Sequence, residues 1–359
     1  MATQRPAPAR PPKNRLLAER LAIGVDIGGT KIAAGVVDED GRILERTRTS
    51  TPTTDPDSVL DAIVEVTETL RENHVVKAIG IGAAGFVDAT QSTVVFAPHL
   101  SWRNEPLRDR VARRTKLPVL VDNDANASGW AEWRFGAAQN EPDLVLITLG
   151  TGIGGAIVID GQTYRGRYGI AGEFGHMRVV PDGRRCECGN VGCWEQYASG
   201  RVLSRFAARE VESDSALGRR LLEVADGALV DGPHVTALAE AGDEACREKI
   251  AEVGHWLGIG MADLAAALDP GMFVIGGGAS AAREMLLAPA RASYEEQLTG
   301  RGFRPTARIV GAHLGPEAGL VGAADMARLT ARRRRPASPG GRVRVRGAGR
   351  SSRSTRRRR

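Results

Sequence analysis

The chain lacks any long apolar segment. None of its 359 residues belongs to a run of eighteen or more apolar residues, and the first twenty contain no apolar stretch of signal-peptide length. A transmembrane helix needs about 20 such residues, and a signal peptide needs an apolar core of about 7–15. We therefore expect a cytoplasmic protein without a membrane partner.

The body of the chain also lacks a basic excess, although the whole chain has a formal net charge of +6. Residues 331–359 hold 13 arginines and no acid, and residues 1–20 carry a net charge of +4. Removing both from +6 leaves −11 for residues 21–330. The composition of the two ends predicts a disordered arm over 1–20 and a disordered Arg-rich tail over 331–359. Nucleic acid is not an expected partner, apart from non-specific phosphate contacts that the tail could make.

Between these ends, short runs rich in Val and Ile alternate with segments of helical apolar spacing. The runs predict strands and the spaced segments predict helices. Strands are expected at 21–27, 32–38, 40–50, 76–85, 117–123 and 272–275, and helices at 58–73 and 124–136. This alternation predicts a mixed α/β fold.

One segment is echoed about 120 residues later in the chain. GVDIGGTKIAAGVVDEDG (24–41) has the order strand, glycine turn, strand, Asp-Gly turn, and LVLITLGTGIGGAIVIDG (144–161) repeats it. The echo predicts a duplicated architecture in which each half offers a glycine hairpin to one shared ligand.

Three glycine clusters are suited to phosphate, since glycine lets several backbone N–H groups approach an anion without side chains in the way. They are Gly28-Gly29-Thr30 followed by Lys31, Gly150-Thr151-Gly152, and Gly276-Gly277-Gly278. Each alone is compatible with an ordinary tight turn. Together they favour a nucleotide phosphate site.

Two common nucleotide motifs are missing. The chain has no G-x-x-x-x-G-K-[ST] run, which excludes a P-loop. Residues 150–155 do match G-x-G-x-x-G, but the segment 156–160 that follows is strand-like. A dinucleotide fingerprint requires a helix there, so that interpretation fails.

Cysteine is scarce, with four in the chain, yet three lie within eight residues as Cys186, Cys188 and Cys193. Disulfides are not expected in a cytoplasmic protein. Three thiolates lack one ligand for tetrahedral zinc, and His176 is the nearest candidate for the fourth place. The alternative is a set of reduced structural cysteines. Cys246 lies in a predicted helix and is expected to be a small core residue.

Carboxylates occur near the predicted strand ends and around the cysteines. Asp122, Asn123 and Asp124 follow the strand residues PVLV (118–121), although either Asp could simply cap the next helix. Glu173 precedes His176 by three residues, and Glu195 follows Cys193 by two. Acceptor-rich side chains of this kind can hold several hydroxyl groups of a sugar at once.

Five motifs in this order resemble the ROK family of sugar kinases and repressors. They are DIGGTK (26–31), DNDANA (122–127), LGTGIGG (149–155), GEFGH (172–176) and CECGNVGCWEQYASG (186–200). The resemblance extends from about residue 21 to about residue 330. It implies an actin-like, ribonuclease-H-like fold of two α/β domains with a cleft between them.

The resemblance also implies domain limits. We expect a small α/β domain over 21–123, completed by a C-terminal helix near 317–330, and a large α/β domain with the zinc loop over 124–316.

Carried over to this chain, the resemblance assigns a role to each matching residue. Asp124 would be the general base that accepts the proton of the attacking hydroxyl. The sugar contacts would be Gly85, Asn104, Asn123, Asp124, Glu173, His176 and Glu195. ATP, with Mg²⁺, would contact Gly28, Gly29, Thr30, Lys31, Thr151, Gly152 and Gly277. A structural Zn²⁺ would be held by His176, Cys186, Cys188 and Cys193.

The motif CECGNVGCWEQYASG is most similar to the glucokinase branch, which makes D-glucose the expected substrate and glucose 6-phosphate the expected product. N-acetylglucosamine, N-acetylmannosamine and fructose kinases share much of the same set. Polyphosphate-using relatives usually lack the cysteine cluster, so the resemblance implies ATP as the donor.

A non-catalytic sugar-sensing regulator of the same family is the alternative from another class. Such members carry a helix-turn-helix domain before the DIGGTK hairpin, and we do not expect one within residues 1–20. The resemblance further implies a homo-oligomer, either a dimer or a tetramer.

Overall fold

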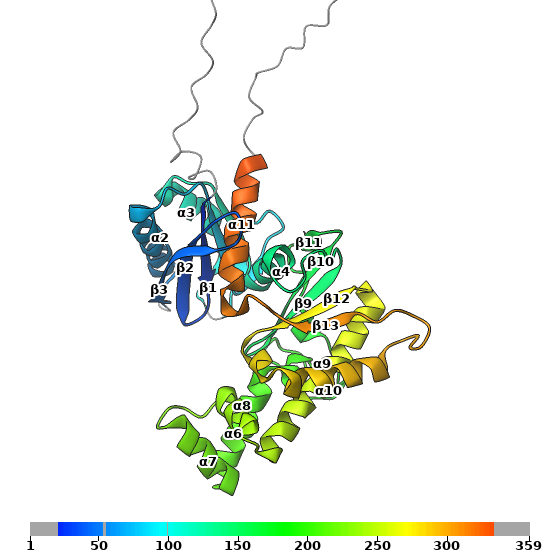
Figure 1. The fold of residues 1–359 in the computed structure, drawn as a ribbon. Helices are drawn as coiled ribbons and strands as arrows, with labels where there is room; N and C mark the ends of the chain where they lie inside the picture. The colour runs from blue at the N-terminus through cyan, green and yellow to red at the C-terminus, as the bar shows by residue number, and fades with distance from the viewer. Residues whose placement is uncertain (1–20, 53–54, 99, 334–359) are drawn as a thin grey trace, which may run out of the picture.

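The computed structural model describes residues 21–52, 55–98 and 100–333. They form two five-stranded sheets, each covered by helices, and a group of helices beyond the second sheet (Figure 1). The arm predicted over 1–20 and residues 334–359 of the predicted tail lie outside the described residues. No helix in the described part of the chain is long and apolar enough to span a bilayer.

The first sheet has the strand order β3-β2-β1-β4-β8. Its strands are β1 (Ala22–Ile27), β2 (Lys31–Val37), β3 (Ile43–Ser50), β4 (Ile79–Ala83) and β8 (Val119–Asn123). The central strands β1 and β4 are parallel and apolar along almost their whole length, because helices cover both faces. Helices α2 (Pro56–Asn73) and α3 (Leu107–Thr115) lie on one face, and α11 (Ala318–Arg333) lies on the other.

The second sheet repeats this topology with the order β11-β10-β9-β12-β13. Its strands are β9 (Leu144–Leu149), β10 (Ile153–Ile159), β11 (Gln162–Tyr164), β12 (Met272–Gly276) and β13 (Arg308–Gly311). In each sheet the first two strands, β1 and β2 or β9 and β10, form an antiparallel hairpin. The first strand of each hairpin also pairs in parallel with a later strand, β1 with β4 and β9 with β12. The duplication predicted from the echoed hairpins is confirmed.

Helices also cover the second sheet on both faces. One face carries α9 (Glu244–Leu268) and α10 (Glu284–Gln297), and the other carries α4 (Asp124–Phe135). The remaining helices are α5 (Glu195–Ala198), α6 (Gly200–Glu212), α7 (Ala216–Ala225) and α8 (Gly232–Glu240). They share one apolar core with α9 and the second sheet, so this helical group is fixed to the sheet. Cys246 is fully buried in that core, as expected.

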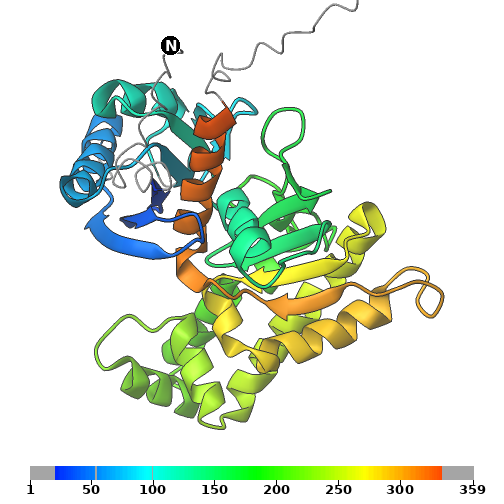
Figure 2. The same cartoon turned by 45° about the horizontal axis from the view of Figure 1, so that its top comes forward.

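Helices α4 and α11 lie side by side between the two sheets (Figure 2). Their approach is close because glycines face the neighbouring backbone. A Cβ atom on Gly322 of α11 would lie 1.8 Å from the carbonyl oxygen of Ala127 of α4. On its other side α11 also meets the first sheet closely, since a Cβ atom on Gly80 of β4 would lie 1.8 Å from the carbonyl oxygen of Ala323. The two halves of the molecule are therefore joined by a tightly packed pair of helices, α4 and α11.

A small three-stranded sheet follows β4. It consists of β5 (Phe86–Val87), β6 (Val94–Phe96) and β7 (Arg103–Glu105), in the order β5-β6-β7. Short 3-10 helices also occur as η1 (Phe174–His176), η2 (Gly278–Ala282) and η3 (Gly315–Glu317).

Two predicted boundaries need correction. The strand expected over 40–50 begins only at Ile43, because Asp38 Oδ1 accepts hydrogen bonds from the backbone N–H groups of Asp40 and Arg42 and closes a turn there. The C-terminal helix continues to Arg333, three residues into the predicted tail, and Arg332 pairs with Glu39 at 3.6 Å. For the domains themselves we propose the limits 21–123 and 124–316.

Candidate active site

Asp124 is the first residue of α4, directly after β8 ends at Asn123. The helix is capped by Asn123, whose Oδ1 accepts hydrogen bonds from the N–H groups of Ala125 and Asn126 at 2.9 and 3.1 Å. The alternative role of Asp124 as the N-cap is therefore wrong. Its Oδ1 accepts one backbone hydrogen bond, from Ala125 at 2.9 Å, which leaves acceptor capacity for a ligand.

The side chain of Asn123 is largely committed to the fold. Besides capping α4, its Nδ2 donates to the carbonyl oxygen of Gly85 at 3.1 Å. Its amide group also interacts with the Asp124 carboxylate and lowers the pKa of that group. Because its oxygen already accepts two hydrogen bonds, any sugar contact of Asn123 is as a donor. The same bond brings Gly85, after β4, next to the start of α4.

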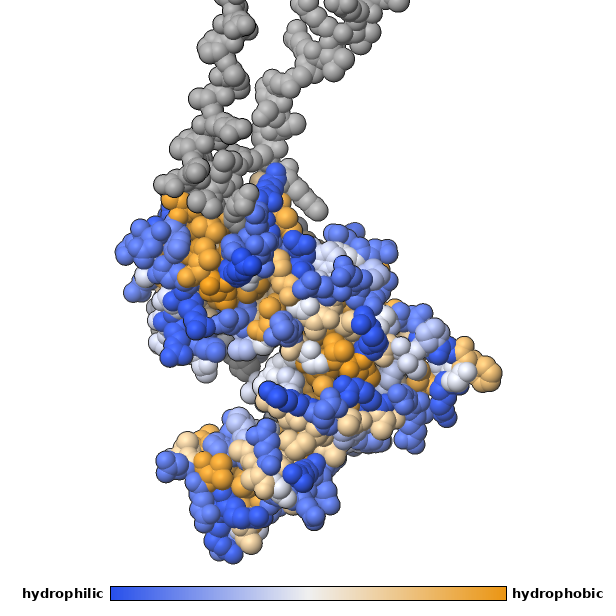
Figure 3. All heavy atoms as spheres, in the orientation of Figure 1, coloured by the Kyte–Doolittle hydropathy of each residue, from blue (hydrophilic) through white to orange (hydrophobic). Residues whose placement is uncertain are grey.

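Asp124 lines a cavity of about 450 Å³. Asp26 from the end of β1 lines it too, together with the segments 276–278 and 315–319. Over the same region the surface is hollowed between the first sheet and helices α6–α8 (Figure 3). The cavity therefore receives residues from both sheets, as a cleft between two halves requires.

Asp26 is a site residue that the sequence-based assignment missed. Burial, and after it the charge of Asp124, raise its pKa to about 7 against the opposing effect of the Lys31 charge. The signal was its place at the carboxyl end of a parallel strand beside a glycine turn. A buried carboxylate beside a second one is a suitable ligand for a hard cation.

Three carboxylates share this poorly solvated region. Burial raises the pKa of Asp124, although hydrogen bonds from the Ala125 backbone oppose the shift. Burial also raises the pKa of Glu173 to about 7, with further contributions from the charges of Asp124 and then Glu195. Asp124 thus acts electrostatically on both Asp26 and Glu173, so the three carboxylates share one neighbourhood.

A second cavity, of about 210 Å³, adjoins the first at Gly278. Its lining includes the β9–β10 turn residues Gly150 and Thr151 and several residues of α6 and α8, among them Leu203 and Pro233. Mixed apolar side chains and backbone N–H groups suit a purine with attached phosphates.

Gly277 closes this part of the site. It has a φ of 84°, and a Cβ atom there would lie 2.5 Å from the backbone nitrogen of Leu149. Only glycine meets both conditions. The third glycine cluster is thereby held against the end of β9, next to the β9–β10 turn.

The β1–β2 turn, Gly28 to Lys31, is closed by a hydrogen bond from the Gly28 N–H to the Lys31 carbonyl oxygen at 3.0 Å. Thr51 Oγ1 also donates to the carbonyl oxygen of Gly28 at 2.8 Å. Among the residues described as lining the two cavities, none belongs to this turn. Its connection to the cavity is through Asp26, whose carboxylate the Lys31 charge influences.

The four predicted metal ligands lie together. The ligand atoms of His176, Cys186, Cys188 and Cys193 are all within 4.8 Å of one another. The Cys188 and Cys193 Sγ atoms are 3.6 Å apart, and His176 Nδ1 is 3.8 Å from Cys186 Sγ. A tetrahedral zinc with Zn–S bonds of about 2.3 Å separates its sulfur ligands by about 3.8 Å. The donor set and its spacing therefore fit Zn²⁺.

Glu195 connects this cluster to the β9–β10 turn. Its Oε1 lies 3.1 Å from Cys186 Sγ and 4.0 Å from His176 Nδ1. Its Oε2 accepts from the backbone N–H of Ile153 at 3.4 Å. With His176 Nδ1 directed at the cluster, Nε2 is the ring nitrogen left for a hydroxyl group.

Asn104 is the one predicted sugar residue that these contacts do not bring into the group. It is exposed on β7, with a φ of 52°. Among the described residues, no polar contact joins Asn104 to Asn123, Glu173 or His176.

Comparison with known proteins shows the family to which the chain belongs. The model of the ROK family matches residues 22–329. A Streptomyces coelicolor glucokinase is 49% identical over 310 residues, 86% of this chain and 98% of that enzyme. A Thermotoga maritima glucokinase is 35% identical, over 85% of this chain and 96% of that enzyme. A ROK family glucokinase from Streptomyces griseus, solved in complex with glucose and AMPPNP, has a TM-score of 0.80 and 50% identity over 86% of this chain and 99% of that one. The predicted actin-like fold is confirmed.

Proposed function

This chain belongs to the ROK family, and on that premise we propose that it is an ATP-dependent glucokinase that makes glucose 6-phosphate from D-glucose. One observation carries the proposal. The Asp124 carboxylate, of raised pKa, faces a cavity that also receives Asp26 and the Gly277 loop. A base for a hydroxyl group and a seat for phosphates thus share one space.

The sugar is assigned to the residues around Asp124. Glu173 and Glu195 offer acceptors from the second half. His176, with Nδ1 directed at the metal cluster, offers its Nε2–H as a donor, and Asn123 offers a donor beside Gly85. Asn104 completes the proposed set from β7. A hexose hydroxyl both donates and accepts, so a mixture of carboxylate, imidazole and amide groups can orient several at once.

The nucleotide is assigned to the second cavity and its neighbouring turns. Thr151, Gly152 and Gly277 would supply backbone groups for the phosphates. Gly28, Gly29, Thr30 and Lys31 would complete the site from the β1–β2 turn next to Asp26. Asp26 would hold the Mg²⁺ that accompanies ATP, which neutralises charge on the transferring phosphoryl group.

Asp124 acts as the general base. Phosphoryl transfer asks mainly for positioning, and the hydroxyl proton moves late, once the oxygen–phosphorus bond is forming. A desolvated carboxylate of raised pKa accepts that proton more readily than an exposed one. His176, Cys186, Cys188 and Cys193 would hold Zn²⁺, which keeps the loop bearing Glu195 rigid when bound.

We predict that kcat/KM for glucose at saturating ATP falls as the pH decreases through the range in which Glu173, with its pKa raised to about 7, takes up a proton, and as Asp124, whose pKa is also raised, does so. The raised pKa values mean that Asp124 and Glu173 take up protons where ordinary carboxylates stay charged. A protonated Asp124 cannot accept the hydroxyl proton, so activity is present above this range and lost below it. Measurement of kcat/KM from about pH 5 to about pH 9 gives the acidic limb of the pH–rate profile. A rate unchanged down to the lower limit would contradict the assignment.

The direct experiment is product identification. The purified protein is incubated with glucose and MgATP, and glucose 6-phosphate is detected by its dedicated dehydrogenase. ATP-dependent formation supports the proposal. Sugar binding without any product would favour the regulator instead. Inorganic polyphosphate in place of ATP tests the donor, and we expect ATP to be used preferentially.

We extend the proposal to the setting of the enzyme. The acidic body, of net charge −11 over 21–330, fits a cytoplasmic protein that acts on small molecules and has no need of nucleic acid. A dimer or tetramer is the proposed assembly.

A further inference from the structure

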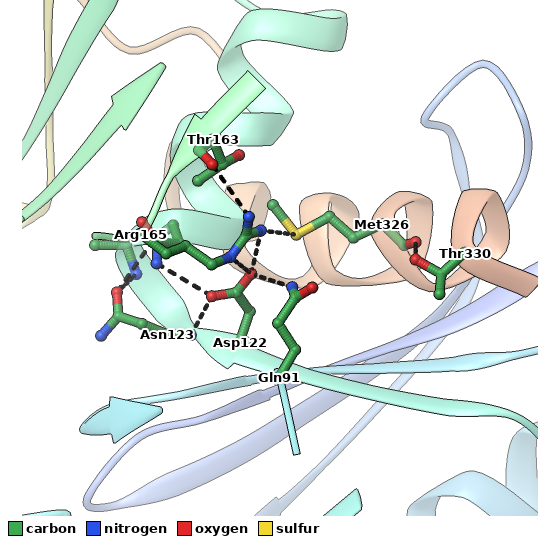
Figure 4. Close-up of polar contacts among 9 residues, drawn as sticks. Gln91, Asp122, Asn123, Thr163, Arg165, Met326 and Thr330 are labelled. Carbon is green, nitrogen blue, oxygen red and sulfur yellow. Dashed lines mark hydrogen bonds and ion pairs between the residues drawn. The ribbon is translucent and has the colours of Figure 1, made fainter. Parts of the chain in front are cut away.

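A polar network beside the site joins the two halves of the molecule. Asp122, the last residue but one of β8, is buried, and its Oδ2 accepts from Arg165 Nε at 2.8 Å and Arg165 Nη2 at 2.5 Å (Figure 4). Gln91 Nε2 donates to the same oxygen at 2.7 Å. Arg165 follows β11 of the second sheet, so two charge-assisted N–H···O bonds cross from one half to the other and converge on a single carboxylate oxygen.

The other oxygen of Asp122 fixes the chain around Asp124. Oδ1 accepts from the Asn123 N–H at 2.9 Å and from Asn126 Nδ2 at 3.1 Å. These partners lie immediately before Asp124 and two residues after it. The Asp122 carboxylate therefore holds the segment that carries the proposed base.

Each nitrogen of the Arg165 guanidinium group makes a contact. Its Nη1 donates to the carbonyl oxygen of Thr163 on β11 at 3.2 Å, and its Nη2 also lies 3.9 Å from Met326 Sδ of α11 (Figure 4). A planar fork can hold a carboxylate and a carbonyl group at once in this way, whereas an ammonium group cannot reproduce the same pattern.

Arg165 also begins the loop that leads to Glu173. The Ala171 N–H donates to the Arg165 carbonyl oxygen at 3.1 Å and closes the neck of this loop. At its tip Gly169 lies against the first half, since a Cβ atom there would be 2.2 Å from the carbonyl oxygen of Val87. The loop is thus tied to the first half at two places before it supplies Glu173 and His176.

We propose that Arg165 is a positioning residue, which through Asp122 sets the place of Asp124 relative to Glu173 and His176 on the other half of the molecule. The inference rests on the proposed kinase function. Neither Arg165 nor Asp122 contacts the substrate in this account. Their effect is on geometry, and a misplacement of about 1 Å can cost about 10²-fold in rate.

The test uses the full chain with Arg165→Ala, Arg165→Lys and Asp122→Asn, and Arg167→Ala as the matched control. Arg167 is exposed in the same loop. We expect Arg165→Ala to lower kcat by about 10- to 100-fold with KM for ATP within about twofold. Arg165→Lys should recover only part of the loss, and added ethylguanidinium should raise the rate of Arg165→Ala. The double variant Arg165→Ala/Asp122→Asn should be no slower than the slower of the two single variants, because each substitution removes the same Arg165–Asp122 interaction. Arg167→Ala should match the wild type.

Two results would overturn the proposal. One is a folded, zinc-replete Arg165→Ala protein with wild-type kcat. The other is a loss that equals the unfolded fraction and does not respond to ethylguanidinium. If Arg165→Ala does not fold, Gln91→Met serves instead, and it removes one donor to Asp122 at nearly constant volume. We expect it to lower kcat by about 3- to 10-fold, and an unchanged kcat would count against positioning.

The same measurements separate this inference from the proposed function. A wild-type protein without kinase activity refutes the function, whereas normal wild-type activity with an unaffected Arg165→Ala protein refutes the positioning role alone. Amide hydrogen exchange gives a readout that does not need activity. We expect faster exchange in 122–126 and 165–176 of Arg165→Ala but not in α9, and uniform exchange would contradict the proposal.

Discussion

Replacement of Asp124 by asparagine is expected to lower kcat by about 10²- to 10⁴-fold, while the Kd for glucose stays within about threefold of the wild-type value. Asparagine keeps the shape of the side chain, and its Oδ1 can still accept from the Ala125 N–H at the start of α4. The fold should therefore persist. What disappears is the basic oxygen for the hydroxyl proton, which matters in the transition state and little in the ground state.

The measurement combines steady-state kinetics with glucose binding by calorimetry. Asp160→Asn is the matched control, since Asp160 is exposed in the β10–β11 turn with a φ of 50° that asparagine tolerates well. It should retain wild-type kinetics. Near-normal turnover in a folded Asp124→Asn protein would end the assignment of Asp124 as the base. A loss of glucose binding that accounts for the whole effect would do so as well.

The second large effect is expected for Cys188→Ala, which removes one of the four proposed zinc ligands. Zinc content should fall from about one ion per chain to well below that value, because three remaining donors bind far more weakly. KM for glucose should rise by about tenfold or more, since His176 and Glu195 lie against the same cluster. Metal analysis by mass spectrometry and the sugar dependence of the rate measure both changes.

Cys246→Ala provides the comparison for that experiment. Cys246 is fully buried in α9 and lies in the core of the helical group. Its replacement should cost some stability without changing the zinc content or KM for glucose. Full zinc occupancy together with unchanged KM in Cys188→Ala would contradict the proposed zinc site.

The parts of the site that could be predicted from the sequence are those that depend on residues close together in the chain. The echoed hairpins predicted a duplicated architecture, and the spacing of Cys186, Cys188 and Cys193 predicted a cluster of soft metal ligands. Both depend on residues close together in the chain, where the geometry follows from turns and strand pairing.

What sequence missed depends on contacts between distant segments. Asp26 becomes a site residue because α11 and the segment 315–319 close over it, almost three hundred residues later. Arg165 and Asp122 meet across the two halves, 43 residues apart. The end of α11 was placed too early because arginine-rich sequence can continue a helix where a partner such as Glu39 lies close. No local pattern contains these partners.

The most direct test of the whole account is kcat/KM with MgATP across glucose, fructose, mannose, N-acetylglucosamine and N-acetylmannosamine. The account predicts that glucose exceeds each of the others by at least about tenfold, a difference in transition-state binding of about 1.4 kcal/mol. A preference for another of these sugars would contradict the glucose assignment while leaving Asp124 and the zinc site in place. Absence of phosphorylation for all five, with zinc bound, would contradict the enzyme itself.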